Sequence, residues 1–355
     1  MGLTACRYRT WKLNADGGAY MGSQSIDKFF LSIAWFAAAV LSTADPTGAQ
    51  SVKVKIGTSV SPPSLEQIKP FVAIEKGFFS RYGLDVQLFE FRGDALSTKA
   101  LLAGDLDALM DVGATSAIVS ASKGAKIRVW VIPQPLNPYH FVARKEAATT
   151  LKDLVGKTVA VSAIGAISYH IPRIVLERSG VDADKVRYIA LGSPPDRLKA
   201  LIARKVDATM VTNTEAAKLG SYPDIVDLMD VAKVLPEIPQ EFSIARSDYI
   251  QKNPETMYKL AKAVIETNRW IVANKEGTIE VAKKIMKDES PEILSKTYDM
   301  IDPHLWGVNG DMSESSYAFT VEFLRKVGYM TDALSYNEIF DRRFVDRALK
   351  ELGRK

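Results

Sequence analysis

The sequence predicts an α/β protein with two lobes, two chain crossings between the lobes and a helical C-terminal tail. Three observations support this prediction. Strand-like and helix-like segments alternate from residue 51, the alternation restarts after a proline-rich stretch at 133–138, and from Pro254 onward only helical patterns remain. Alternating strands and helices are typical of a mainly parallel sheet covered by helices. The 355 residues fit two domains of roughly 100–200 residues each.

The first series of segments begins at residue 52. Val52, Val54 and Ile56 alternate with two lysines, which predicts a half-buried strand. Pro70 opens a helix, and Gly83 follows its end. The same reasoning then predicts a strand at 84–91, a helix at 96–102, a strand at 107–112, a helix at 115–122 and a strand at 127–132.

The second series follows the proline-rich stretch and gives way to the tail. It predicts strands ending at 142 and spanning 158–162, 186–191 and 208–211, with helices at 151–155, 168–179, 195–203 and 215–219. The tail predicts helices at 255–274, 278–286, 292–299, 313–327 and 341–352. We expect the tail to pack on the first lobe, so that the chain crosses near 137–144 and 236–246. Two crossings form a hinge around a cleft. The predicted lobes are residues 50–139 with 243–355, and residues 140–242.

The N-terminal segment has the pattern of an export signal. Lys28 precedes an apolar run at 29–41, and small residues and turn formers follow at 42–49. The run is shorter than the ~20 residues that a membrane span needs. We therefore predict that residues 1–49 are a signal peptide with an upstream extension, in which Met21 is a candidate start. The alternative is an N-terminal membrane anchor.

Composition argues against several classes of protein. The only cysteine, Cys6, lies before the apolar run and within the segment 1–49, so the mature chain has no thiol for a disulfide, a nucleophile or a thiolate metal site. The net charge is +4 and no lysine or arginine block occurs, which argues against nucleic-acid binding. The three histidines have no metal-ligand spacing and no phosphate-binding GxxxxGK[ST] loop occurs, so we expect no metal and no cofactor.

Four segments carry a resemblance to a known family. They are 70–86 (PFVAIEKGFFSRYGLDV), 101–107 (LLAGDLD), 151–162 (LKDLVGKTVAVS) and 198–208 (LKALIARKVDA), the last repeating the second. In this order they resemble the nitrate/sulfonate/taurine type of periplasmic substrate-binding proteins of ABC transporters, which are related to thiamine-pyrimidine precursor binding proteins. The resemblance covers about residues 52–290. It implies a two-lobed, type II-like periplasmic-binding-protein fold with mixed sheets in each lobe. It also implies a periplasmic monomer that delivers a small organic ligand to an ABC permease in the inner membrane.

The strand ends indicate where a ligand would bind. In open α/β sheets, ligands lie outside the carboxyl ends of the strands. This rule selects the loops 58–63, 92–94, 113–116 and 133–134 in the first lobe, and 162–169, 192–196 and 212–213 in the second. The candidate ligand-binding residues on these loops are Ser59, Arg92, Gly113, Ala114, Thr115, Gln134, Ser162, Gly165, Ala166, Ser168, Tyr169 and Asn213.

The loop 162–169 (SAIGAISY) is the strongest candidate. A strand enters a glycine-containing loop and then a helix, whose free N–H groups and dipole favour an anion. In the family that the chain resembles, this segment lines the ligand cleft. The loop 113–116 makes the same kind of helix start on the opposite side. The alternative is a plain strand–turn–helix joint with Ser168 as the N-cap.

The ligand class follows from charge. Arg92 could bind a carboxylate or sulfonate through a fork of hydrogen bonds, although a surface arginine is the alternative. Together with the two helix starts, it favours a small organic anion such as a sulfonate or an aromatic carboxylate. Tyr139 and Phe242 are candidate apolar walls. The lack of a denser basic cluster argues against phosphate.

A binding protein is favoured over an enzyme. Enzymes of this fold that desulfurise or build the thiamine pyrimidine use cysteine, and the mature chain has none. We therefore predict no catalytic residues. The alternatives are an enzyme of the same fold, lyase-like or desulfinase-like, and a ligand-sensing binding protein without transport.

Overall fold

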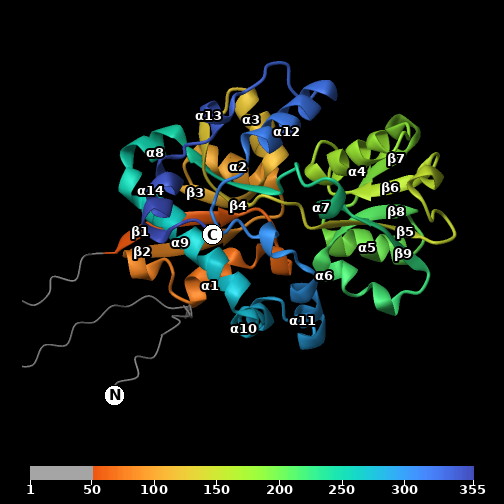
Figure 1. Cartoon of the computed structure of the whole chain (residues 1–355), viewed down its shortest axis with the longest axis horizontal. Helices are drawn as coiled ribbons and strands as arrows, with labels where there is room; N and C mark the ends of the chain where they lie inside the picture. The colour runs from red at the N-terminus through yellow and green to blue at the C-terminus, as the bar shows by residue number, and fades with distance from the viewer. Residues whose placement is uncertain (1–50) are drawn as a thin grey trace, which may run out of the picture. The chain divides into compact units, whose positions relative to one another are not determined.

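The computed structural model describes residues 51–355, which form two mixed sheets of five strands each (Figure 1). The first sheet has the order β2-β1-β3-β10-β4. Its strands are β1 (Val52–Thr58), β2 (Leu84–Glu90), β3 (Ala108–Gly113), β4 (Ile127–Gln134) and β10 (Glu241–Arg246). β1 runs parallel to β2 and β3, whereas β10 runs antiparallel to β3 and β4. The predicted signal peptide lies outside the described residues.

The second sheet repeats this plan. Its order is β7-β6-β8-β5-β9, with β5 (Tyr139–Arg144), β6 (Thr158–Val161), β7 (Arg187–Ala190), β8 (Ala208–Thr212) and β9 (Ile225–Asp230). β6 is parallel to β7 and β8, and β5 is antiparallel to β8 and β9. The predicted α/β class with mixed sheets is therefore confirmed. We call the parts built on the two sheets the first and the second lobe; the exact residue boundaries of the lobes stay a prediction.

Each sheet receives its antiparallel strand from a chain crossing. β5 follows β4 after four residues and enters the second sheet next to β8, and β10 returns the chain to the first sheet next to β3. The two crossings lie side by side, because Glu241 pairs with Gln134 and the Gln240 N–H donates to the Gln134 carbonyl at 3.2 Å. The two crossings thus form one joint between the lobes.

Helices cover both sheets. In chain order they are α1 (Lys69–Glu75), α2 (Asp94–Ala103), α3 (Ala114–Ser122), α4 (Ile167–Arg178), α5 (Pro194–Ile202), α6 (Asn213–Ala216), α7 (Val231–Val234) and α8 (Ser247–Lys252). Short 3-10 turns are η1 (Leu65–Gln67), η2 (Ser80–Tyr82), η3 (Leu151–Leu154), η4 (Ala183–Lys185), η5 (Leu219–Ser221) and η6 (Pro303–Leu305). One apolar core packs on the first sheet, and two smaller cores pack on the second.

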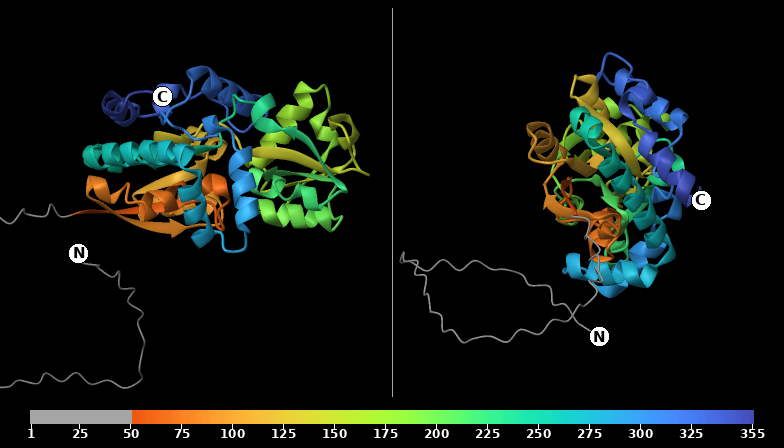
Figure 2. Two further views of the ribbon diagram at one scale, coloured as in Figure 1. Left: turned by 60° about the horizontal axis from the view of Figure 1, so that its bottom comes forward. Right: turned by 90° about the vertical axis from the view of Figure 1, so that its left-hand side faces the viewer.

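Most of the tail's buried residues join the core of the first lobe, and parts of two tail helices also contact the second lobe. The tail helices are α9 (Pro254–Ala273), α10 (Lys275–Ile285), α11 (Pro291–Met300), α12 (Glu314–Lys326), α13 (Tyr336–Ile339) and α14 (Arg343–Leu352). α9 and α14 pack on β4 of the first sheet. α11 also contacts α6 (Figures 1 and 2). Phe319, Phe323 and Val327 of the tail join the core of the second lobe. Within residues 51–355, no helix combines the length and apolarity required to cross a membrane.

Candidate ligand-binding site

The carboxyl ends of β1 and β3 meet around a buried carboxylate. The Ser59 N–H donates to Asp111 Oδ1 at 2.6 Å, and the Thr58 hydroxyl donates to Asp111 Oδ2. The Ser59 hydroxyl shares a hydrogen bond of 2.7 Å with the Ser97 hydroxyl. Burial, together with the nearby charge of Glu241, raises the pKa of Asp111 to about 7. Ser59 is therefore buried and committed to internal partners.

The start of α3 is occupied by a carboxylate of the chain itself, so the expected open anion site is corrected here. The Gly113 N–H donates to Asp94 Oδ1 at 3.2 Å, and the Ser116 side chain also hydrogen-bonds Asp94. The Ala114 N–H donates to the Gln240 carbonyl at 2.9 Å. The Thr115 hydroxyl is buried and has no hydrogen-bond partner within residues 51–355. Burial raises the pKa of Asp94, partly offset by its hydrogen bonds.

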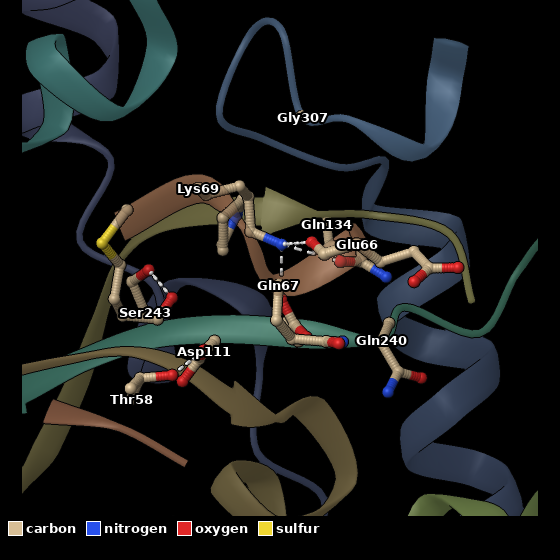
Figure 3. A network of polar contacts seen from close by, with 12 residues as sticks. Thr58, Glu66, Gln67, Lys69, Asp111, Gln134, Gln240, Ser243 and Gly307 are labelled. Atoms are coloured by element: carbon tan, nitrogen blue, oxygen red, sulfur yellow. Dashed lines mark hydrogen bonds and ion pairs between the residues drawn. The ribbon is translucent and has the colours of Figure 1, made fainter. Parts of the chain in front are cut away.

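Gln134 belongs to a buried network at the crossings, shown in Figure 3. Lys69 Nζ donates to Gln134 Oε1 at 2.8 Å, to Glu241 Oε2 at 2.9 Å and to the Glu66 carbonyl at 2.5 Å. Glu241 Oε1 accepts from Gln67 Nε2 at 2.8 Å. An ammonium has three N–H donors, so Lys69 is fully committed. The side-chain oxygen of Gln134 thus serves the network, while its Nε2 has no partner within residues 51–355.

The start of α4 in the second lobe is less occupied. The Ser162 N–H donates to the Ser168 hydroxyl at 2.8 Å, and the two hydroxyls are 2.7 Å apart. Ala166 is the N-cap and offers no side-chain cap, so the N-cap role considered for Ser168 is wrong. Within residues 51–355, the N–H groups of Ile167 and Ser168 have no acceptor. This helix start keeps free donors together with the positive end of its dipole.

The Gly165 loop is fixed against the tail. Gly165 has φ +87°, and a Cβ there would come within 3.0 Å of the Tyr329 ring. Its carbonyl accepts from His170 Nε2 at 2.9 Å, which assigns the proton to that nitrogen. Burial lowers the pKa of His170 to about 4, so this histidine is neutral at physiological pH. Its position supports a structural role over a role as a base.

Tyr169 contacts aromatic side chains and lines a pocket apart from the other predicted residues. Its ring packs edge-on against Tyr188 and Tyr329. It lines a surface pocket of about 520 Å³ together with Arg173, Glu177, Asp184 and Lys326 to Tyr329. Apart from Tyr169, this pocket contains none of the predicted ligand-binding residues.

Asn213 joins the two lobes directly. Its N–H donates to Glu66 Oε1 at 2.9 Å, and its side-chain Oδ1 lies 2.9 Å from His140 Nε2. The neighbouring Thr214 hydroxyl accepts from the Leu65 N–H at 3.2 Å. Asp227, 2.6 Å from His140 Nδ1, raises the pKa of that histidine against the effect of its burial. Asn213 therefore contacts η1 of the first lobe and is not free for a ligand in this arrangement.

Arg92 is exposed and forms no ion pair with any residue of 51–355, so the structure gives it no partner at the site. The arginine that sequence reasoning missed is Arg197, which is 1% exposed. Its Nε and Nη2 donate to the Met210 carbonyl at 3.1 and 2.9 Å. Its Nη1 donates to the Gly192 carbonyl. Burial raises the pKa of Tyr139; the charge of Arg197 opposes this shift and the charge of Asp94 adds to it. The strand-end rule selected the loop 92–94, which contains Asp94, and the loop 192–196, which ends just before Arg197, but it selected neither side chain.

The predicted residues thus fall into three groups. Ser59, Gly113, Ala114 and Thr115 surround Asp94 and Asp111, Gln134 and Asn213 lie in networks at the joint, and Ser162, Gly165, Ala166 and Ser168 form the start of α4. The helices α3 and α4 are in contact, so the first and third groups lie on contacting helices of opposite lobes. Within residues 51–355, no group of three metal-ligating side chains occurs.

Comparisons with known proteins give relatives of one kind. The chain is 26% identical over 222 residues to a binding protein of Brucella abortus (strain 2308), covering 61% of this chain and 66% of that relative. It is 24% identical over 250 residues to the taurine-binding periplasmic protein of Escherichia coli (strain K12), covering 67% and 72% of the two chains.

Solved structures show the same fold. The aliphatic sulphonate binding protein SsuA of Escherichia coli has a TM-score of 0.68 at 17% identity, covering 83% of this chain and 99% of that one. The nitrate-binding protein NrtA of Synechocystis PCC 6803 has a TM-score of 0.73 at 14% identity, covering 86% and 90%. The desulfurization enzyme DSZB has a TM-score of 0.64 at 15% identity, covering 84% and 99%. The family model described as NMT1/THI5 like matches residues 66–277, more than half of the chain, and the chain therefore belongs to the NMT1/THI5-like family.

Proposed function

We propose that the chain is an exported solute-binding protein that captures a small organic ligand between its lobes and delivers it to an ABC permease. The observation that carries this proposal is the arrangement of the strand ends. Two sheets of the same order are joined by two adjacent crossings, and their strand-end helices α3 and α4 are in contact. Lobes joined in this way close around a ligand by hinge motion.

The second lobe supports a ligand with an anionic group. The free N–H groups of Ile167 and Ser168 lie at the start of α4, a helix of 12 residues. Such a helix start binds carboxylates and sulfonates through backbone donors and the helix dipole. The small organic anion expected from the sequence is therefore proposed for this side of the site.

The partner and the compartment follow from the relatives. The Escherichia coli relative is named as a periplasmic taurine-binding protein, and the structural neighbours include sulfonate- and nitrate-binding proteins. By analogy with them, we propose that this protein acts in the periplasm as a monomer and presents the closed, loaded form to an inner-membrane permease. The fold alone fits a ligand sensor equally, and only the identity of the docking partner distinguishes the two.

An enzymatic role is the second candidate because the desulfurization enzyme DSZB shares the fold. Residues 51–355 contain no cysteine, so a thiol nucleophile is absent from this part of the chain. His170 is held neutral by burial and its Nε2 is bound to the Gly165 carbonyl. These observations favour binding over catalysis.

Native mass spectrometry of the protein isolated from the periplasm tests the proposal. We expect a small molecule to co-purify, to be released by unfolding and dialysis, and to rebind unchanged with a rise in Tm. The dialysed, refolded protein is the control. Conversion of the rebound molecule into a product would contradict the binding-protein function.

A further inference from the structure

We propose that Asp94 is a specificity-determining residue that makes the start of α3 a site for an N–H donor group of the ligand, such as an ammonium, and excludes an oxyanion there. This inference rests on the proposed binding function and concerns one end of the same site. Asp94 follows β2, on the strand-end loop 92–94, and begins α2.

The carboxylate of Asp94 lies where the oxyanion of a ligand would bind. Asp94 Oδ1 accepts the Gly113 N–H, and Asp94 Oδ2 would lie 2.6 Å from a Cβ built on Gly113. The Ser116 side chain also hydrogen-bonds this carboxylate. The donors of this helix start are thus directed at an internal carboxylate. A ligand oxyanion would compete with Asp94 for these donors and, wherever Asp94 is ionised, would face like-charge repulsion in a partly buried site.

The surrounding side chains add to the negative character of the site. Four further buried carboxylates occur at these strand ends and at the joint: Glu66, Asp111, Glu215 and Glu241. The buried lysine and arginines are Lys69, whose three N–H donors are committed, and Arg197 and Arg269, which donate to main-chain carbonyls. Arg92 is exposed. No uncommitted buried cation within residues 51–355 is therefore present to hold an oxyanion at α3.

Two buried polar atoms of residues at the start of α3 have no partner within residues 51–355. They are the Thr115 hydroxyl, in a residue that is 1% exposed, and Gln240 Oε1, in a residue that is 7% exposed. Thr115 is the second residue of α3, and the Gln240 carbonyl accepts the Ala114 N–H at the same helix start. Both atoms can accept a hydrogen bond. Unpartnered buried acceptors are costly, and three donors of an ammonium match Asp94, Thr115 and Gln240.

The second lobe provides donors for the other end of the ligand. α3 contacts α4, whose start keeps the free N–H groups of Ile167 and Ser168. The start of α3 is bound by the carboxylate of Asp94, whereas the first N–H groups of α4 have no acceptor within residues 51–355. The ligand class that matches both ends is a small zwitterion, with its N–H donor group at Asp94 and its anionic group at α4.

Matched probe pairs test this assignment by isothermal titration calorimetry on the dialysed, refolded exported protein. The pairs are 3-aminopropane-1-sulfonate with propane-1-sulfonate, and 3-aminopropanoate with propanoate, so the members of each pair differ only by the ammonium. We expect the ammonium-bearing member of at least one pair to bind about tenfold tighter or more, the effect of one charge-assisted hydrogen-bond set. The sulfonate and carboxylate pairs distinguish which anionic group α4 accepts.

Variants assign the preference to Asp94. Asp94→Asn keeps the shape and should abolish the preference for the ammonium member, whereas Asp94→Ser should open the helix start and increase affinity for the member without it. Asp105→Asn, an exposed carboxylate on the next loop, should leave the preference unchanged. Equal affinities within each pair, a preference that survives in Asp94→Asn, or no binding of any probe overturns the inference. Binding without an ammonium preference refutes only the inference, while turnover of the co-purified molecule refutes the proposed function.

Discussion

Asp111 lies at the end of β3, only 1% exposed, and its two carboxylate oxygens accept from Thr58 and Ser59. Burial and the charge of Glu241 raise its pKa from 3.8 to about 7. An acid with a raised folded-state pKa favours the protonated form in the folded protein. The resulting stabilisation is complete below pH 3.8 and is lost as the pH rises through about 7.

Asp111→Asn should therefore flatten the pH dependence of stability. Between pH 5 and pH 8, the free energy of unfolding of the natural protein should fall by about 1 kcal/mol or more relative to the variant, since one pKa unit corresponds to about 1.4 kcal/mol. Urea unfolding at both pH values measures this difference. Asp85→Asn, on an exposed position of β2, is the control. The same pH slope in the natural protein and in Asp111→Asn would contradict the assigned pKa.

At the scale of elements, the joint between β6 and α4 depends on a left-handed residue. Gly165 has φ +87° and lies against Tyr329, whereas Gly180, at the other end of α4, has φ +70° and nothing within 4 Å of an added Cβ. A left-handed backbone costs an L-residue roughly 1–2 kcal/mol. Gly180→Ala should lose about that much stability.

Gly165→Ala should lose more stability than Gly180→Ala, because it adds the contact with the Tyr329 ring to the same backbone cost. It should also weaken ligand binding, since the Gly165 loop, whose carbonyl is bound to His170, directly precedes the free donors Ile167 and Ser168 of α4. Chemical denaturation of both variants measures the difference in stability. If the two variants lose equal stability, the loop is not fixed by Tyr329.

The longer helices and the central strands β3 and β8 were predictable from the sequence to within a few residues, but strand β9 and the neighbours of each strand were not. The predicted helix 168–179 is α4 at Ile167–Arg178, because apolar periodicity and the glycine loop mark it. Strand β9 (Ile225–Asp230) was missed, since Asp227 and Asp230 interrupt its apolar pattern. β5 was predicted only as a short strand ending at 142, and β10 was assigned to a crossing although it lies between β3 and β4, because periodicity does not specify which strands are neighbours.

In the candidate site, the loops were predictable from the sequence, but the directions and partners of their side chains were not. The strand-end rule identified the loops, including 92–94, but charge at a loop indicated Arg92 when the structure directs Asp94 to the helix start. Asn213 was predicted as a ligand contact, yet its N–H is bound to Glu66, 147 positions earlier in the sequence. Such contacts depend on how the lobes meet and on the direction of each side chain, which a linear pattern does not contain.

At the scale of the whole described chain, the lobes are held together at more than the two crossings. Glu66 of η1 accepts from the Asn213 N–H at the end of β8. Lys218, after α6, pairs with Glu289, just before α11, and Lys326 of α12 pairs with Glu177 of α4 at 3.1 Å. The tail therefore restrains the hinge from both sides of the second lobe, at α6 and at α4.

Glu66 is the restraint whose loss should open the hinge most. It is fully buried, and burial raises its pKa, so its hydrogen bonds to the second lobe are formed out of water. Glu66→Ala would remove the acceptor of the Asn213 N–H and of the Thr214 hydroxyl. Leaving these buried donors unpaired costs about 1–3 kcal/mol of stability unless the lobes separate and water reaches them. The ligand-free variant should therefore populate an open form with a larger radius of gyration, measured by small-angle X-ray scattering.

The controls separate the hydrogen bonds from the charge. Glu66→Gln retains a side-chain oxygen for the Asn213 N–H, so its scattering should match the natural protein. Glu75→Gln removes a surface carboxylate that pairs with Lys284, both outside the second lobe, and should also leave the radius unchanged. Because binding affinity falls with the population of the closed form, Glu66→Ala should also bind the co-purified ligand more weakly than Glu66→Gln. An unchanged radius in Glu66→Ala would mean that the tail contacts at α4 and α6 are sufficient to keep the lobes closed.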